Sequence, residues 1–347
     1  MGGIDMEKLT IRDIARMAGV STTAVSFVLN GRSGVSDATR QKVQEIIRQT
    51  GFTPNIHTRR LNLKRSFTVH VVMRQYDFSL FNLFAMDVLT GIFKESKLLG
   101  YSVIFTAVEK DTECSELMDA IHSKDSDGVI FIQVCNQKVI RLLQEEQFPY
   151  LCVDSHVPQD GTIPLLEVNY YDAARRAICY LVEKGHRDIG FLISDRHQEF
   201  HKHTLAGFTD AMVNAGLPCR PEWMQRVIHN IPQPATNAME KMLACRPWPT
   251  AVFCASDTYA ANAIRYLTGR GLRVPEDISF MGLDDLVISE YTRPAITTMG
   301  LDKIHMGRQA MHTLFQMMNG QEFQRVQLLP TTLVERDSVC TLSEGKP

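Results

Sequence analysis

Apolar residues in the first fifty positions recur three or four residues apart in three short stretches, which is the spacing of a helix with one buried face. The residues that share this spacing and are expected to face inward are Ile11, Ile14 and Ala15 in the first stretch, Ala24, Val25, Val28 and Leu29 in the second, and Val43, Ile46 and Ile47 in the third. Gly19, Asn30-Gly31 and Gly51 follow the three stretches and are expected to end them. The pattern therefore predicts a small domain of three helices.

Polar residues mark where these helices begin. The run from Thr10 to Asp13 has the form of a capping box, in which the Thr10 hydroxyl accepts from the Asp13 amide and the Asp13 carboxylate reaches back. Ser21 is placed to cap the second helix and Ser36 to begin the third. Two helices joined by a short turn that contains glycine form a helix-turn-helix, and the A-x-x-A-G-V-S string from Ala15 to Ser21 is typical of one. An ordinary three-helix domain is the alternative interpretation.

From Phe67 onward the pattern changes to short apolar runs that alternate with helical stretches. The runs that are predicted to be buried strands are Val69–Met73, Val103–Val108, Gly128–Ile132 and Tyr150–Asp154, followed by Ile189–Ile193, Ala251–Ala255 and Ile278–Leu283. Helices are expected around Ala177, Phe208, Ala261 and Met311. This alternation predicts an α/β fold with doubly wound parallel sheets, and the two series of strands predict two lobes around a cleft. Ligands of such sheets bind outside the carboxyl ends of the strands.

A chain of 347 residues is longer than one typical domain, so two or three domains are expected. Its hydrophobic content of 44% fits globular folding throughout. Eight cysteines are scattered without a C-x-x-C pair, which favours reduced thiols over a disulfide framework or a zinc ribbon. The first ten residues contain no apolar run, and no later stretch approaches the roughly 18 uncharged apolar residues of a membrane span. We therefore expect a cytoplasmic protein without a membrane partner.

Charge is divided unevenly along the chain. Residues 1–66 contain eleven Lys and Arg residues and five Asp and Glu residues, a net charge of +6, whereas the other residues contain 26 and 34, a net charge of −8. A small basic domain on an acidic remainder indicates that the first domain binds a polyanion. An ordinary solvated basic surface is the alternative.

The string TIRDIARMAGVSTTAVSFVLNGRSGVSDATRQKV at 10–43 resembles the amino-terminal signature of LacI/GalR regulators. The strings that continue the resemblance are GFTPN (51–55), GHRDIGFL (185–192), LAGF (205–208), CASDTYAANAI (254–264), GLRVPEDISFMGLDD (271–285), TTM (297–299) and LLPTTLVER (328–336). The resemblance implies an all-α helix-turn-helix DNA-binding head, a hinge, and a core of two lobes like those of periplasmic sugar-binding proteins.

The resemblance also implies where these parts begin and end. The expected segments are a helix-turn-helix domain at 1–53, a hinge helix and linker at 54–66, an N-terminal core lobe at 67–167 with 301–327, and a C-terminal core lobe at 168–300 with 328–347.

In a helix-turn-helix the first residues of the second helix lie at base edges in the major groove, and here these are Thr22, Thr23 and Phe27. Phe27 stands where the family more familiarly has arginine, so we expect either an apolar contact, such as one to a thymine methyl group, or a packing role under the hinge. With the flanking positions and those that match phosphate contacts in the family, the expected DNA-binding residues are Thr10, Ser21, Thr22, Thr23, Ser26, Phe27, Asn30, Ser36, Thr39, Asn55, Thr58, Arg59 and Leu61.

Residues 54–63 resemble the family's hinge helix, which begins after a proline and orders on operator DNA. Leu61 matches the leucine that is inserted into the minor groove to kink the duplex, and the alternative is one apolar face of a linker helix. Arg59 and Arg60 are expected to lie against phosphates. Thr58 departs from the usual alanine, which puts the depth of insertion in doubt.

The expected effector-binding residues follow predicted strands or match ligand contacts of the resembling regulators. They are Arg74, Phe78, Phe84, Asp154, Tyr170, Thr204, Ser256, Asp257 and Asp284. The carboxylates suit a polyol, because each oxygen accepts a hydrogen bond from a hydroxyl. The three aromatic residues are either flat walls for a sugar ring or core packing.

Two of these positions depart from the family, which commonly has arginine at Thr204 and asparagine at Ser256. Arg74 either supplies the missing cation, which would suit an acidic ligand, or is a surface charge at a strand end. His197, His201 and His203 have a spacing compatible with a metal site. A polar loop at the mouth of the cleft is the preferred interpretation, so neither a metal nor another cofactor is expected.

These expectations favour a sequence-specific transcription regulator, a repressor by family habit, that binds a pseudo-palindromic operator as a homodimer and responds to a small carbohydrate-like effector. A regulator that is effector-independent or gated by a protein partner is the alternative. An enzyme is not expected, because the chain contains no G-x-G-x-x-G or G-x-S-x-G string. A periplasmic sugar-binding protein is not expected either, because residues 1–66 stand where a signal peptide would be.

Overall fold

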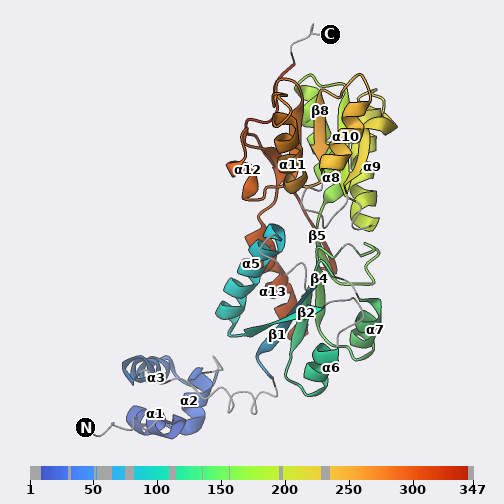
Figure 1. Cartoon of the computed structure of the whole chain (residues 1–347). Coiled ribbons are helices and arrows are strands. Elements are labelled where there is room, and N and C mark those ends of the chain that lie inside the picture. The colour runs from blue at the N-terminus through green and yellow to red at the C-terminus, as the bar shows by residue number, and fades with distance from the viewer. Residues whose placement is uncertain are drawn as a thin grey trace, which may run out of the picture. The chain divides into compact units, whose positions relative to one another are not determined.

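The protein consists of two compact units, which we call the head (residues 1–66) and the body (residues 67–347) (Figure 1). The computed structural model describes residues 9–29, 33–50, 52, 65–74, 82–108, 115–134, 136–155, 157–194, 198–227 and 235–342. The predicted hinge at 54–63 lies outside these residues.

The described part of the head contains the helices α1 (Ile11–Ala18), α2 (Thr22–Leu29) and α3 (Asp37–Thr50). The predicted capping box of α1 is confirmed, because the Asp13 amide donates to Thr10 Oγ1 at 3.4 Å and the Thr10 amide donates to Asp13 Oδ2 at 3.0 Å. Gly19 ends α1 with φ 66°, a left-handed conformation that glycine adopts without steric cost. The turn from Gly19 to Ser21 then leads directly into α2.

One apolar side chain from each helix meets at the centre of the head. Ile14, Val25 and Val43 are each 0% exposed. The other buried residues of this cluster are Ala15, Ala18, Val28 and Phe52. The residues that were predicted to face inward but are only half-buried are Ile11, Ala24, Leu29, Ile46 and Ile47. The shared core fixes α2 against α1 and α3, so the exposed face of α2 has a defined direction within the head.

The body is built on two six-stranded sheets. Sheet A consists of β1 (Thr68–Arg74), β2 (Ser102–Val108), β3 (Gly128–Ile132), β4 (Tyr150–Val153), β5 (Leu165–Val168) and β11 (Val326–Leu329), in the order β11-β5-β4-β3-β1-β2. Sheet B consists of β6 (Ile189–Ser194), β7 (Met224–Val227), β8 (Ala251–Cys254), β9 (Ser279–Asp284), β10 (Thr297–Gly300) and β12 (Thr332–Val334), in the order β12-β10-β9-β8-β6-β7. Neighbouring strands are parallel except for the antiparallel pair of β10 and β12.

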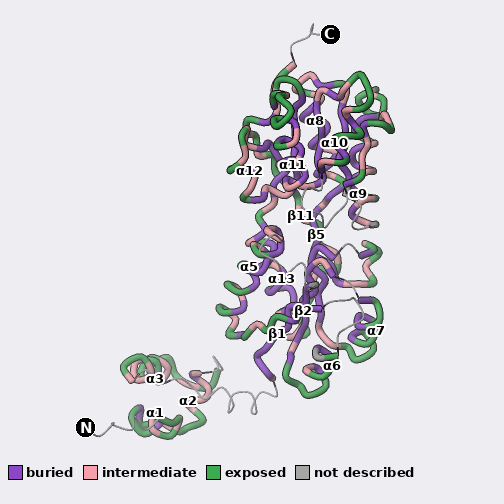
Figure 2. Tube along the Cα trace, in the orientation of Figure 1, coloured by how far each residue is buried: buried purple, intermediate pink, exposed green. Residues whose placement is uncertain are grey.

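Helices cover the sheets and leave the central strands in the interior, as the buried central traces in Figure 2 show. The helices that accompany sheet A are α5 (Leu83–Leu99), α6 (Ser115–His122), α7 (Gln137–Glu145) and α13 (Lys303–Met318). Those that accompany sheet B are α8 (Tyr170–Glu183), α9 (Gln198–Asn214), α10 (Thr236–Ala244), α11 (Asp257–Thr268) and the short α12 (Ile288–Tyr291), with a 3₁₀ turn at Pro221–Trp223. The predicted doubly wound α/β architecture is therefore confirmed.

The seven predicted strands are present, each within one residue at either end. The strands β5, β7, β10, β11 and β12 were not predicted. The chain passes between the sheets after β5, after β10 and after β11. The expected lobe boundary after residue 327 is two residues early, because Leu328 and Leu329 pair with Glu167 and Val168 in sheet A.

Two glycines allow α5 and α13 to cross at close range. A Cβ at Gly91 would lie 2.0 Å from the Ile304 carbonyl oxygen, and one at Gly307 would lie 2.0 Å from the Val88 carbonyl oxygen. The two backbones are therefore in direct contact at both positions, and no side chain fits between them. Because α13 follows the second passage between the sheets, this crossing fixes the start of that helix against sheet A.

We predict that Gly307→Ala lowers the free energy of unfolding by about 1–3 kcal/mol, because its methyl group has to push apart two packed helix backbones. Chemical denaturation followed by circular dichroism measures this change. Gly269→Ala is the matched control, since Gly269 is exposed and has the right-handed backbone conformation of φ −63°. Equal stability of the two variants would contradict the close crossing.

Candidate functional site

The first turn of α2 presents hydroxyl groups at the surface of the head. Thr22 and Thr23 are the first two residues of α2 and both are exposed. Ser21 precedes them and its Oγ accepts from the Ala24 amide at 3.1 Å, so it caps the helix as predicted. Because that hydroxyl oxygen is engaged by the helix, the two threonines are the side chains at this end with the most freedom to meet another molecule.

The start of α3 carries a second hydroxyl pair. Ser36 is exposed and its Oγ lies 2.9 Å from Thr39 Oγ1, while the Thr39 amide donates to Ser36 Oγ at 3.3 Å. At the start of α1, the Thr10 hydroxyl donates to Asp13 Oδ2 at 2.6 Å. Hydrogen bonds from Thr10 lower the pKa of Asp13, so this carboxylate is stabilised in its charged form.

Two other predicted residues of α2, Ser26 and Phe27, are half-buried. The remaining predicted DNA-binding residues, Asn30, Asn55, Thr58, Arg59 and Leu61, lie outside the described residues, and so does Arg60. Their roles stay predictions.

In the body, the predicted effector residues gather where strands of both sheets end. Asp154 directly follows β4, Tyr170 begins the helix after β5, Asp257 begins the helix after β8, and Asp284 is the last residue of β9. Parallel strands end at one edge of a sheet, so each sheet contributes carboxylates at such an edge. Burial raises the pKa of Asp284, and the charges of Asp257 and Asp154 raise it further, so the carboxylates of the two sheets influence one another.

Asp154 is fully buried and both of its carboxylate oxygens are engaged. The Tyr170 hydroxyl donates to Oδ1 at 2.6 Å and Gln133 Nε2 donates to Oδ2 at 2.8 Å. Asn82 extends this network by donating to Gln133 Oε1 at 3.0 Å. The Tyr170 ring packs edge-on against Phe200, with 4.6 Å between the ring centroids. Burial and the charge of Asp154 raise the pKa of Tyr170, so its hydroxyl stays protonated as a donor.

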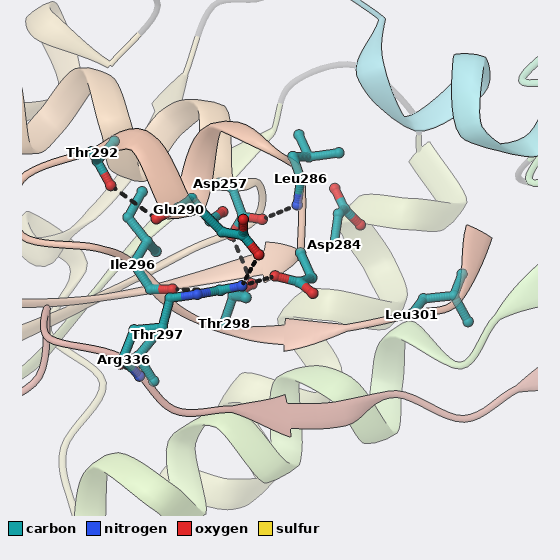
Figure 3. Close-up of polar contacts among 12 residues, drawn as sticks. Asp257, Asp284, Leu286, Glu290, Thr292, Ile296, Thr297, Thr298, Leu301 and Arg336 are labelled. Carbon is teal, nitrogen blue, oxygen red and sulfur yellow. Dashed lines mark hydrogen bonds and ion pairs between the residues drawn. The ribbon is translucent and has the colours of Figure 1, made fainter. Parts of the chain in front are cut away.

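Asp257 is also fully buried, and its carboxylate holds the loop that follows β9 (Figure 3). One oxygen accepts from the Leu286 amide and the other from the Thr298 hydroxyl, both at 2.7 Å. Burial raises the pKa of Asp257 to about 6. Both oxygens face protein groups, which assigns Asp257 a structural role and leaves an effector contact without support from its geometry.

Asp284 differs from the other carboxylates. It is half-buried, and its side chain makes no hydrogen bond or ion pair with any residue that the structure describes. Figure 3 shows it beside the bonded network of Asp257 and Arg336 without a dashed line of its own. Its backbone has φ 98°, a conformation that non-glycine residues rarely adopt. A half-buried carboxylate without a partner is the best-placed acceptor for a ligand among the described candidates.

Lys303 holds the backbone beside this carboxylate. Lys303 Nζ donates to the carbonyl oxygens of Asp284 at 2.7 Å and Asp285 at 2.8 Å, and lies 4.0 Å from Asp87 Oδ2 on α5. The lysine is 6% exposed, so these oxygens replace the water that its ammonium group would otherwise bind. Arg336 holds the next carboxylate, with its guanidinium 2.8 Å from Asp285 Oδ1.

Three further candidates are built into the protein interior or its helices. Phe84 is buried in α5, and Thr204 is fully buried in α9 with its hydroxyl donating to the Phe200 carbonyl oxygen at 2.8 Å. Ser256 caps α11, because its Oγ accepts from the Thr258 amide at 3.3 Å. Arg74 ends β1, but its side chain lies outside the described residues, as does Phe78.

The histidine segment shows no metal centre in its described part. His203 Nδ1 lies 3.3 Å from Gln159 Nε2, and His203 Nε2 lies 3.8 Å from Glu199 Oε2. Across the described residues, no group of three or more His, Cys, Asp or Glu side chains could hold a metal ion. His197 is outside the residues that the structure describes.

The sequence analysis missed two residues of the body site. Gln133 directly follows a predicted strand, so the rule that pointed to Asp154 would also have found it. Lys303 begins a helix that was expected only around Met311, and nothing in its spacing shows that its side chain turns back toward β9.

A helix-turn-helix head on a periplasmic-binding-protein-like body defines a DNA-binding transcription regulator. A profile of bacterial regulatory proteins of the lacI family matches residues 10–55, and a profile of the periplasmic binding protein-like domain matches residues 178–339. Residues 10–55 therefore match a LacI-family DNA-binding domain and residues 178–339 a periplasmic binding protein-like domain, as the resemblance predicted.

Repressors are similar to the chain over nearly its whole length. It is 29% identical over 333 residues to the HTH-type transcriptional repressor PurR of Pasteurella multocida, covering 95% of this chain and 98% of that protein. It is 28% identical over 335 residues to the ribose operon repressor of Haemophilus influenzae, covering 96% and 99%. A crystal structure of the lac repressor dimer bound to operator and the anti-inducer ONPF matches with a TM-score of 0.75 and 27% identity, covering 96% of this chain and 100% of that chain.

Within the described residues, no helix is both long enough and apolar enough to cross a bilayer.

We predict that Asp257→Ala lowers the free energy of unfolding by about 1–3 kcal/mol, because the buried Leu286 amide and Thr298 hydroxyl lose their acceptor. Asp257→Asn is the matched variant, since one amide oxygen still accepts from Leu286 and the amide nitrogen can donate to the threonine. Thermal and chemical denaturation measure both. If the Asp257→Ala protein were as stable as wild type, Asp257 would again be a candidate for contact with the effector.

Proposed function

We propose that the protein is a transcriptional repressor whose homodimer binds a pseudo-palindromic operator through two heads. A small, carbohydrate-like effector binds between the strand ends of the two sheets and changes the affinity for the operator. The first helical turn of α2, with Thr22 and Thr23 exposed at its tip, is the observation that carries the proposal.

Threonine side chains suit base edges for two reasons. Their hydroxyl groups donate or accept, and their methyl groups contact the methyl group of thymine. The start of α3 adds Ser36 and Thr39, whose hydroxyls suit phosphate oxygens. The net charge of +6 on residues 1–66 supplies attraction that does not depend on sequence.

A homodimer is supported by apolar side chains that the body leaves exposed. They are Met86, Phe93 and Leu98 on α5, Ile104 and Phe105 on β2, and Val287 and Tyr291 on α12. β2 is the outermost strand of sheet A in the described part of the chain and contacts α5, and its consecutive residues Ile104 and Phe105 expose apolar side chains on its two faces. Exposed apolar side chains that form a contiguous patch mark protein interfaces, and a second copy of the body would cover such side chains. A symmetric dimer also matches two half-sites of a palindrome.

The charges around the body site favour a neutral effector rich in hydroxyl groups. Asp284 offers acceptor oxygens that bond to no residue in the described part of the chain, and Asp154 and Asp257 lie close enough to raise its pKa. An anionic ligand would meet three carboxyl groups here, with Lys303 already engaged by carbonyl oxygens. A polyol donates hydrogen bonds to such oxygens without adding like charge. The ribose operon repressor of Haemophilus influenzae, to which the chain is similar, is named for an operon of a sugar.

A ligand held by both sheets changes their relative angle, because only three passages of chain join them. In a dimer, that angle sets the separation of the segments that lead to the two heads. The effector then weakens or strengthens operator binding according to which angle it prefers.

We predict that removal of residues 1–66 abolishes specific DNA binding and leaves a folded dimer, because the body is a compact unit with its own cores. Gel-shift assays of the full chain and residues 67–347 against the promoter of its own locus test the first part, and sedimentation tests the second. Equal shifts by both proteins would refute the assignment of DNA binding to the head.

We predict that Asp284→Ala leaves operator affinity without effector within about twofold but raises the effector concentration for half-maximal response at least about tenfold, because an acceptor for the hydroxyl groups of the effector is lost. A thermal-shift panel of pentoses, hexoses, nucleosides, purine bases and their phosphates identifies the effector first. Asp119→Ala on the exposed surface of α6 is the matched control. An unchanged dose-response for Asp284→Ala would remove this residue from the effector site.

A further inference from the structure

We infer that Phe27 is a positioning residue for operator binding: its ring packs on Gly34 and sets the geometry between α2 and the start of α3, and it does not select a base. The inference rests on the proposed DNA-binding function of the head. It decides between the two roles that the sequence leaves open for this residue.

The position of Phe27 makes base reading the first expectation. Phe27 follows Thr23 by four residues in α2, so the two side chains lie on one face of the helix. Thr23 is exposed on this face, but Phe27 is half-buried. Its ring does not belong to the apolar cluster at the centre of the head either. A contact within the head covers part of the ring.

Gly34 provides that cover. The ring atoms Cε2 and Cδ2 of Phe27 lie 3.0 and 3.1 Å from the point where a Cβ on residue 34 would stand. These distances are shorter than ordinary van der Waals contact, so the ring occupies the space that a side chain at position 34 would need. One edge of the ring thus packs against the segment between α2 and α3.

The backbone conformation of Gly34 also explains why a glycine packs against Phe27. Its φ of 114° is a conformation that other residues rarely adopt. Glycine is therefore required at position 34 for its backbone conformation and again for the space that Phe27 fills. An aromatic ring at 27 and glycine at 34 form one packing unit, in which neither residue can change without effect on the other.

This unit lies between the two surfaces that the head offers to DNA. Gly34 is two residues before Ser36, whose Oγ lies 2.9 Å from Thr39 Oγ1 at the start of α3. The ring therefore fixes the phosphate-contacting hydroxyls of α3 relative to the base-contacting threonines of α2. Phosphate contacts place a protein on the duplex but carry no sequence information, so loss of the ring weakens binding to every sequence alike.

Selection from random DNA duplexes with the full chain tests the inference without a known operator. We compare wild type, Phe27→Leu, Phe27→Ser and, as a base-reading control on the same helix, Thr23→Val. Phe27→Ser is expected to lose about tenfold in affinity for strong and weak sites alike and to keep the wild-type base preferences, whereas Phe27→Leu, which retains apolar cover, recovers most of the affinity. Thr23→Val is expected to change the preference at one position of each half-site.

A changed base preference for Phe27→Ser, or wild-type affinity, would overturn the inference. A double-mutant cycle of Phe27→Ala and Gly34→Ala, read by hydrogen exchange of residues 9–29 and 33–50 without DNA, tests the packing directly. The loss of protection in Gly34→Ala is expected to be smaller when the ring is absent, and additive effects would also overturn the inference. If the wild-type chain selects no sequence, the proposed function fails, and the cycle still decides whether the ring and the turn are coupled.

Discussion

The arrangement of the body depends on one buried ammonium group. Lys303 begins α13, a helix that packs on sheet A, and its Nζ is bonded to the carbonyl oxygens of Asp284 and Asp285 at the end of β9 in sheet B. A lysine that is 6% exposed needs such oxygens, because an unpaired buried charge is far less stable than a hydrated one. Asp284 has φ 98°, and a strained backbone of this kind costs on the order of 1–3 kcal/mol unless its surroundings hold it. The lysine and the strained turn thus stabilise each other at a passage between the sheets.

That turn also explains why the carboxylates of the body have different roles. Asp154 and Asp257 each lie on one sheet and use both oxygens on neighbouring groups, so they fix local structure. Asp284 is held through its backbone, which leaves its carboxylate without a protein partner among the described residues. Burial and two like charges raise the pKa of Asp284, so its ionised form is unfavourable without a ligand. A hydroxyl donor at this point would relieve part of that cost.

Local rules in the sequence were sufficient for the head and for much of the body. The capping box at Thr10 and the glycine after α1 depend on neighbours within four residues, so they could be predicted. The strands β10 to β12 contain threonine, glutamine or glycine, so they lack the continuous apolar run by which the equally short β4 and β8 were recognised. Asp257 follows a strand as a ligand-binding residue would, but whether its carboxylate faces a ligand or the Leu286 amide depends on the fold of a loop 29 residues away. Side-chain direction was therefore the part of the candidate site that spacing could not give.

The division of charge gives the two units opposite responses to DNA. Phosphates attract a head of net charge +6 and repel the remainder of net charge −8, so an encounter with DNA is productive mainly when the head arrives first. Attraction of this kind is independent of sequence and weakens as salt rises, whereas the proposed base contacts of Thr22 and Thr23 would distinguish one sequence from another. An effector bound in the body need not change either the electrostatic attraction of the head or its base contacts. In the proposed dimer it would have only to prefer one angle between the sheets, because a changed separation of the heads would cost both half-sites their simultaneous contacts while leaving each head intact.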